Sequence, residues 1–375
     1  MSRRRIVVRQ HVVGATPRTA DYQLRVVYML KLSIPFTCGL FLVVGWAGGA
    51  TGLGATVPEA AAVKVIEFAP ADSAEKAPVV SSVALNPAGK LLAAVGDDHL
   101  VRIVDSHSGN LLSCWKSHTD WVKASAFRPD GQVLATSGAD RRIHLWDLSG
   151  QERPRNLPER LQVIYALSYS PDGRMLAAAG FDDQVGIYDA ANGRLLCEQA
   201  APGKDIRALC FSPDGAQLAA AGRAGLVRIW NVSKCEQIAE VQVSSRRICA
   251  LAYSPDGKLL AAGGQQRVVR LLDATSGKPV ADLPERPGEV LALCFCGPDL
   301  LASAGSGNVI HIWDVATRQE QCRLVGHTGS ITTLVFHRDA AQLISGSYDT
   351  TVRLWDVKKL ERDKITLRVG PARAN

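Results

Sequence analysis

Short runs of alternating apolar and polar residues fill the chain from about residue 63 to residue 369, and turn-forming residues separate them. Alternation over five or six residues predicts β-strands with one buried face, and turns at about every 8 to 12 residues are typical of antiparallel meanders. Within one stretch we expect four strands, at Ile164–Tyr169, Met175–Ala179, Gln184–Tyr188 and Leu195–Gln199. The pattern therefore predicts an all-β protein made of four-stranded antiparallel units.

The four-stranded unit repeats along the chain at intervals of 42 residues, once shortened to 41. Its clearest marker is an apolar run that ends in Asp or Asn, as in Leu145-Trp146-Asp147, and the last residue stands at positions 105, 147, 189, 231, 273, 314 and 356. One small sheet cannot bury both of its faces, whereas seven sheets stacked around an axis can, and closure of the ring protects their edges. We therefore predict a seven-bladed β-propeller and expect it to be a monomer.

Two of the units carry four additional side chains at matching places. They are His118, Thr136, Asp140 and Trp146 in the second unit, and His327, Ser345, Asp349 and Trp355 in the seventh. Together with the repeat, these residues resemble the WD-repeat family over about residues 78–360. The resemblance implies that each set is a structural tetrad joined by hydrogen bonds, not a catalytic His–Asp pair. Ala224, Gln266 and Gly307 replace the Asp in units four to six.

The resemblance also implies that a strand from one chain end closes the ring. We favour Val63–Phe68 for this role, and Ile365–Val369 is the competing segment. The expected organisation is a basic leader with an apolar export signal or membrane anchor at 1–50 and a linker at 51–62, followed by the propeller at 63–369 and a tail at 370–375.

Most of the positive charge lies in the leader. The chain has a net charge of +7, and residues 1–31 contain seven basic side chains and one acidic side chain, which leaves a net charge of +1 for the rest. Binding to nucleic acid depends on a basic surface that neutralises phosphates. We therefore expect no nucleic-acid partner for the propeller.

An apolar run without charged residues, Leu32–Ala50, follows the basic residues. This order predicts either a cleaved export signal or a retained membrane anchor of about 20 residues. Both readings place the propeller outside the cytoplasm, as a periplasmic or extracellular protein or one anchored to the cytoplasmic membrane. Met29 is an alternative start of the signal. Export would permit disulfides among the nine cysteines, whose spacing fits neither a zinc knuckle nor a haem motif.

In the WD-repeat family, partners bind the face that carries the loops entering the inner strands. Where these strands begin, an apolar β-branched residue recurs in every unit, as at Val122 and Ile164, while the side chains on either side of it vary. Packing positions must repeat in a symmetric ring, whereas binding positions are free to differ. The candidate partner-binding residues are Trp121, Lys123, Tyr165, Phe181, Asp205, Arg207, Arg247, Glu289 and Tyr348.

These candidates do not form the pattern of a catalytic or metal site. A propeller enzyme needs His, Asp or Glu side chains that converge at the mouth of the channel, and the sequence contains neither a Gly-rich phosphate loop nor a nucleophile elbow. We therefore expect a non-enzymatic scaffold for protein or peptide partners, with no cofactor and no bound metal. The alternative is a propeller enzyme or a carbohydrate-binding module.

Overall fold

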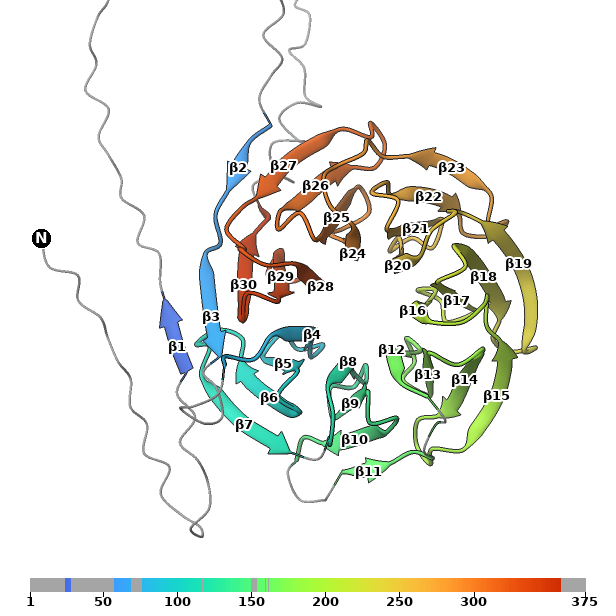
Figure 1. Ribbon diagram of the computed structural model, residues 1–375, viewed down its shortest axis with the longest axis horizontal. Helices are drawn as coiled ribbons and strands as arrows, with labels where there is room; N and C mark the ends of the chain where they lie inside the picture. The colour runs from blue at the N-terminus through green and yellow to red at the C-terminus, as the bar shows by residue number, and fades with distance from the viewer. Residues whose placement is uncertain are drawn as a thin grey trace, which may run out of the picture.

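Seven small β-sheets stand radially around a central axis (Figure 1). The computed structural model describes residues 57–68, 76–116, 118–149, 154–158, 160 and 162–358, together with the secondary structure of Leu24–Val27. Every sheet contains four antiparallel blade strands, and two sheets carry one additional strand. The predicted all-β, seven-bladed propeller is therefore confirmed.

The blades are numbered along the chain, and their strands are given from the axis outwards. Blade one contains β4 (Val80–Leu85), β5 (Leu91–Gly96), β6 (Leu100–Asp105) and β7 (Leu111–Lys116). Blade two contains β8 (Val122–Phe127), β9 (Val133–Gly138), β10 (Ile143–Asp147) and β11 (Arg155–Asn156). Blade three contains β12 (Ile164–Tyr169), β13 (Met175–Gly180), β14 (Gln184–Asp189) and β15 (Leu195–Ala200). Blade four contains β16 (Ile206–Phe211), β17 (Gln217–Gly222), β18 (Leu226–Asn231) and β19 (Glu236–Gln242).

The last three blades complete the circle. Blade five contains β20 (Ile248–Tyr253), β21 (Leu259–Gly264), β22 (Arg270–Asp273) and β23 (Pro279–Asp282). Blade six contains β24 (Val290–Phe295), β25 (Leu300–Gly305), β26 (Ile310–Asp314) and β27 (Glu320–Leu324). Blade seven contains β28 (Ile331–His337), β29 (Gln342–Ser347), β30 (Thr351–Asp356) and the N-terminal β3 (Lys64–Phe68). The strands expected in the third unit agree with blade three to within one residue at each end.

The hydrophobic core lies between the blades. Each of the seven clusters of buried apolar residues joins two neighbouring blades. In the cluster between blades four and five, for example, Ala219 and Ile229 pack with Ile248 and Leu260. Burial of one such Leu or Ile side chain contributes about 1.5–3 kcal/mol. Because every blade is stabilised by its neighbours, the ring depends on closure.

The N-terminal segment closes the ring. β3 pairs antiparallel with β30, in the register Lys64 to Leu354 and Ile66 to Val352. Ile66 is fully buried in the cluster between blades seven and one. The competing segment, Ile365–Val369, lies outside the described residues. Closure by β3 joins sequence-distant parts of the chain in one sheet, which is visible where the blue and red strands meet (Figure 1).

Two further strands come from ranges in which we expected a leader and a linker. β1 (Leu24–Val27) pairs antiparallel with β3 at the outer edge of blade seven. β2 (Glu59–Ala60) pairs parallel with β27 at the outer edge of blade six, where Arg323 N donates to Pro58 O at 2.8 Å. Both strands cover outer edges that would otherwise be open to pairing with another chain.

One disulfide links neighbouring blades. Cys197 in β15 of blade three is bonded to Cys235, which precedes β19 of blade four, and their Cα atoms are 6.4 Å apart. This pairing could not be derived from the spacing of the cysteines. It follows from the ring, which places the outer strand of one blade beside the turn of the next.

Candidate functional site

The tetrad of blade two forms a continuous hydrogen-bonded chain. His118 Nε2 lies 2.8 Å from Thr136 Oγ1, and Trp146 Nε1 donates to the same hydroxyl at 2.8 Å. His118 Nδ1 lies 2.7 Å from Asp140 Oδ2. Burial raises the pKa of Asp140, but the hydrogen bond and charge of His118 outweigh this effect and the net pKa is lowered. The carboxylate therefore stays ionised at the end of the chain, where Thr119 N also donates to it at 3.2 Å.

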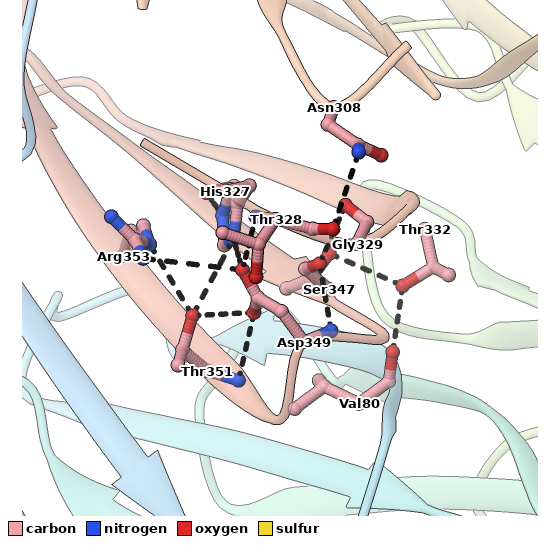
Figure 2. A network of polar contacts seen from close by, with 12 residues as sticks. Val80, Asn308, His327, Thr328, Gly329, Thr332, Ser347, Asp349, Thr351 and Arg353 are labelled. Atoms are coloured by element: carbon pink, nitrogen blue, oxygen red, sulfur yellow. Dashed lines mark hydrogen bonds and ion pairs between the residues drawn. The ribbon is translucent and has the colours of Figure 1, made fainter. Parts of the chain in front are cut away.

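The tetrad of blade seven has the same geometry. His327 Nε2 lies 2.7 Å from Ser345 Oγ, to which Trp355 Nε1 donates at 2.8 Å, and His327 Nδ1 lies 2.7 Å from Asp349 Oδ2. Thr351 Oγ1 also donates to Asp349, at 2.6 Å. Figure 2 shows Asp349 at the centre of this network. A polar chain with all its members paired makes a blade rigid, because breaking any one bond leaves a buried polar group without a partner.

Contacts around this tetrad also join blade seven to both of its neighbours. Thr332 Oγ1 donates to Val80 O of blade one at 2.8 Å, and Asn308 of blade six donates from Nδ2 to Thr328 O at 3.3 Å (Figure 2). The blade in which the N-terminal strand closes the ring is therefore fixed on both sides.

Blades three and six contain an arginine where the tetrad histidine would stand, a substitution that the sequence analysis missed. Arg160 and Arg286 each precede the first residue of the inner strand by four positions, as His118 does. Arg160 donates to Asp182 Oδ2 at 3.1 Å and to Tyr188 Oη at 3.0 Å. The signal was present in the sequence, because aligning the seven repeats places both arginines in the histidine column.

In blade six the arginine pairs with an acidic residue of the outer strand. Arg286 Nη2 lies 2.8 Å from Glu320 Oε2, and the guanidinium carbon lies 4.9 Å from the centroid of the Trp313 ring. Trp313 Nε1 still donates to Ser303 Oγ at 2.8 Å, so half of the tetrad remains. Glu320 also binds Arg323 and His311. Glu320 thus provides the negative charge that Gly307 cannot supply at the Asp position.

Among the described residues, His118, Asp140 and His144 are the group whose atoms are close enough to hold a metal ion, with one ligand atom from each within 4.8 Å of the others. Both ring nitrogens of His118 already contact Asp140 and Thr136, and Nδ1 of His144 contacts Asn156 Oδ1 at 2.5 Å. Burial and the neighbouring His118 lower the pKa of His144 and favour its neutral form. The arrangement is therefore that of a packed structural pair of rings, whose centroids are 4.3 Å apart.

The candidate binding residues lie on the loops and strand starts at one end of the central axis of the ring, which we call the mouth. The side chains of Trp121, Phe181 and Tyr348 are 39%, 42% and 46% exposed. Lys123 Nζ lies 3.8 Å from the centroid of the Trp121 ring, and the Arg207 guanidinium carbon lies 3.5 Å from that of Tyr165. These cation–π contacts hold the two cations against aromatic faces at the mouth.

The charge of Arg207 also acts on two other candidates, Lys123 and Tyr348. Burial lowers the pKa of Lys123, and repulsion from Arg207 lowers it further. Burial raises the pKa of Tyr348, while the charge of Arg207 acts in the opposite direction. These residues come from blades two, four and seven. Side chains that are far apart in the sequence thus share one electrostatic environment.

Asp205 differs from the expectation of a direct partner contact. It is buried, with 2% of its surface exposed, and it has a positive φ of 59°. Its carboxylate lies 2.5 Å from Arg207 Nε and 2.7 Å from Arg247 Nη2. The structure therefore makes Asp205 a positioning residue that orients two arginines of adjacent blades.

Glu289, half-buried in blade six, has its backbone N–H bonded to Ser306 Oγ at 2.8 Å.

Comparison with known proteins agrees with the fold. The profile of the family described as WD domain, G-beta repeat matches residues 72–105, 109–147, 156–189 and 318–356. The profile described as Anaphase-promoting complex subunit 4 WD40 domain matches 195–254 and 241–298. The two profiles together cover blades one to five and seven, and the beginning and end of blade six.

Similar stretches occur in several curated proteins. The chain is 38% identical over 58 residues to U3 snoRNP-associated protein-like EMB2271 of Arabidopsis thaliana, which covers 16% of the chain and 12% of the relative. It is 38% identical over 60 residues to Eukaryotic translation initiation factor 3 subunit I of Schizosaccharomyces pombe, covering 16% and 18%. It is 35% identical over 65 residues to Pre-mRNA-processing factor 19 homolog 2 of Arabidopsis thaliana, covering 17% and 12%. The aligned part thus spans less than a fifth of each relative.

These relatives contradict the prediction that the propeller is exported or anchored outside the cytoplasmic membrane. Their names refer to a U3 snoRNP, to translation initiation and to pre-mRNA processing. This particle and these processes are found inside the cell. The predicted signal peptide and membrane anchor lie outside the described residues, within which no helix has the length and apolar character needed to cross a membrane. An uncharged run such as Leu32–Ala50 is required for a membrane span, but hydropathy alone does not identify one.

Proposed function

Because this chain belongs to the WD-repeat β-propeller family, we propose that it is a non-enzymatic scaffold that binds protein or peptide partners at the mouth of its channel. The observation that carries the proposal is the difference between the buried positions of the inner strands and the residues at the mouth, where these strands begin. The buried positions of the repeat are nearly uniform, while the mouth presents exposed aromatic side chains and cations packed against aromatic rings. Aromatic residues and arginine are the side chains most enriched at binding hot spots.

The proposed contact residues are Trp121, Lys123, Tyr165, Phe181, Arg207, Arg247, Glu289 and Tyr348, with Asp205 holding the arginines in place. Their support comes from their shared location on one face and from the exposure of Trp121, Phe181 and Tyr348. The names of the relatives refer to a snoRNP-associated protein and to a subunit of an initiation factor, which are parts of larger assemblies. By analogy we propose that this chain also acts within an assembly.

The alternative of a propeller enzyme gains no support from the mouth. The metal-compatible group found among the described residues, His118–Asp140–His144, lies within the hydrogen-bonded network of blade two. The mouth itself contributes cations and aromatic rings that are engaged with each other. Such a surface fits binding better than acid–base chemistry, which requires a group free to transfer a proton to a substrate.

Binding at the mouth can be tested with the double variant Trp121→Ala/Tyr348→Ala. We expect partners captured from whole-cell extract by the wild-type chain to bind the variant at least about 30-fold more weakly, because truncation of even one hot-spot aromatic costs about 2 kcal/mol or more. The measurement is quantitative capture at a series of bait concentrations, with each captured protein followed by mass spectrometry.

The matched control is Leu112→Ala/Leu196→Ala. It removes two comparably exposed apolar side chains from the outer strands β7 and β15, away from the mouth. Circular dichroism verifies that both variants fold. Equal capture by the wild type and the mouth variant, or equal losses in the mouth variant and the control, would contradict the proposed location of the site.

A further inference from the structure

Positive charge is concentrated in one sector of the mouth, although the net charge of the propeller is close to zero. Four loops of blades four and five reach this face, at residues 201–205, 223–225, 243–247 and 265–269. They contain five cations, to which Arg207 at the start of β16 adds a sixth. These cations, which we call the basic rim, are Lys204, Arg207, Arg223, Arg246, Arg247 and Arg267. The four loops contain a single acidic residue, Asp205.

Backbone hydrogen bonds join three of the four loops into one surface. Val243 N and Ser244 N both donate to Gly225 O at 3.0 Å, which ties the loop of blade four to the loop entering blade five. Gly225 has a φ of +70°, and a Cβ there would lie 2.0 Å from Ser244 O. Gln265 N donates to Arg247 O at 3.0 Å, which joins the loop at 243–247 to the loop at 265–269. The cations are therefore held on a fixed frame, which lowers the entropy lost when a ligand binds them.

The charge of the basic rim is largely uncompensated. Lys204, Arg223, Arg246 and Arg267 are exposed, and none of them forms an ion pair with another described residue. The one carboxylate, Asp205, is shared by Arg207 and Arg247. Arg247 Nε is buried and has no hydrogen-bond partner among the described residues. A buried donor without a partner costs free energy, so Asp205 does not satisfy all the donors of the two arginines.

We propose that the basic rim binds an acidic segment of a protein partner, with carboxylate side chains pairing with the arginines of blades four and five. This inference rests on the proposed function, and it names the chemistry of the partner. Carboxylates match the planar guanidinium in a bidentate geometry, and opposite charges at the rim of an interface speed association and give specificity. The chain's own segments outside the described residues are poor occupants, because residues 1–31 carry seven basic side chains and one acidic one.

A single-stranded nucleic acid fits the same surface less well. Such ligands are held by aromatic side chains on which successive bases stack, together with the charges that follow the backbone. None of the four loops contains an aromatic residue. The exposed aromatics of the mouth, Trp121, Phe181 and Tyr348, belong to blades two, three and seven. The aromatic ring against the basic rim, that of Tyr165, is already stacked with Arg207. The rim thus offers charge without a free ring for bases, which favours carboxylates on a flexible peptide.

The test is fluorescence anisotropy of the full chain with three labelled probes. The probes are a Glu-rich peptide, the same peptide with Gln at every Glu, and an oligouridine of similar length. We expect the Glu-rich peptide to bind at least about tenfold more tightly than the Gln peptide and more tightly than the RNA, and to weaken as salt is raised. Equal binding of the two peptides, or tighter binding of the RNA, would overturn the proposal.

The location is tested with Arg223→Ser/Arg246→Ser, which removes two exposed cations of the rim. The matched control, Arg174→Ser/Lys258→Ser, removes two exposed cations from turns between the first and second strands of blades three and five, at the opposite face. Both variants have the same net charge. We expect about tenfold weaker binding of the Glu-rich peptide by the rim variant alone, since each exposed ion pair contributes up to about 1 kcal/mol. Equal effects of the two variants would overturn the proposal.

The two proposals fail in different ways. If the proposal of an acidic ligand is wrong, the variant Trp121→Ala/Tyr348→Ala still loses the captured partners, while the protein binds the Glu-rich peptide no more tightly than the Gln peptide. If the mouth is not the binding face at all, the captured partners are insensitive to both the aromatic and the rim variants.

Discussion

Replacing Ser345 with alanine is expected to lower the free energy of unfolding by about 3 kcal/mol. The hydroxyl is fully buried and lies between two partners, accepting from Trp355 Nε1 at 2.8 Å and lying 2.7 Å from His327 Nε2. Because His327 Nδ1 faces the Asp349 carboxylate, the network assigns the ring proton to Nδ1 and leaves Nε2 as an acceptor. The substitution therefore leaves one buried donor and one buried acceptor without partners, at about 1–3 kcal/mol each.

Blade six provides the matched comparison. Ser303 has the same place relative to Trp313 but, among the described residues, only the indole N–H bonds to its hydroxyl, at 2.8 Å. We expect Ser303→Ala to cost about half as much, because a single donor loses its partner. Urea unfolding followed by tryptophan fluorescence and by circular dichroism measures both values. Equal losses for the two serines would show that the tetrad contributes no more than an isolated hydrogen bond.

Glu320→Gln is expected to destabilise the protein by about 3 kcal/mol at neutral pH, and this difference should disappear in acid. The Glu320 side chain is 2% exposed and pairs with Arg286, His311 and Arg323. Burial alone would raise the pKa of Glu320, but hydrogen bonds from Arg323, His311 and Arg286 outweigh it and lower the pKa from 4.5 to about 2. A shift of this size corresponds to about 3 kcal/mol of stability.

The direction of the pH dependence follows from the lowered pKa. The folded state holds the carboxylate ionised, so its contribution is fully present above pH 4.5 and is lost as the pH falls towards about 2. Urea unfolding of the wild type and the variant at pH 7, 5, 4 and 3 checks this. The expected result is a constant difference between pH 7 and 5 that narrows below. A difference that does not change with pH would mean that the three partners do not stabilise the charged form.

Glu198→Gln in blade three is the control for this experiment. Glu198 also pairs with an arginine in the histidine column, at 3.1 Å from Arg160 Nη1, but its side chain is 34% exposed. Ion pairs open to solvent contribute at most about 1 kcal/mol. We therefore expect a small effect for Glu198→Gln, with weak dependence on pH. The contrast separates the effect of burial from the presence of an ion pair.

The structure places one candidate residue differently from the expectation, and it shows two residues that the sequence reasoning missed, each for a physical reason. Asp205 is charged and stands next to a variable strand start, which made it resemble an exposed contact residue; its burial between Arg207 and Arg247 depends on two blades that meet only in the ring. The arginines at 160 and 286 were overlooked because the tetrad was sought by residue identity. Arg160 pairs with Asp182 and Glu198, and Arg286 pairs with Glu320; both glutamates lie on the outer strands.

The sequence by itself determined the number of blades, the strands of each blade and the composition of the two tetrads. These properties depend on local alternation and on a repeat of fixed length, both of which are visible in one dimension. It favoured the segment that forms β3 for closure of the ring without excluding its competitor, and it did not determine the disulfide or the electrostatics of the mouth. These depend on which blades become neighbours and on how deeply each charge is buried. The basic rim is the clearest case, because charges that average to nearly zero along the propeller sequence become one concentrated surface only when blades four and five stand side by side.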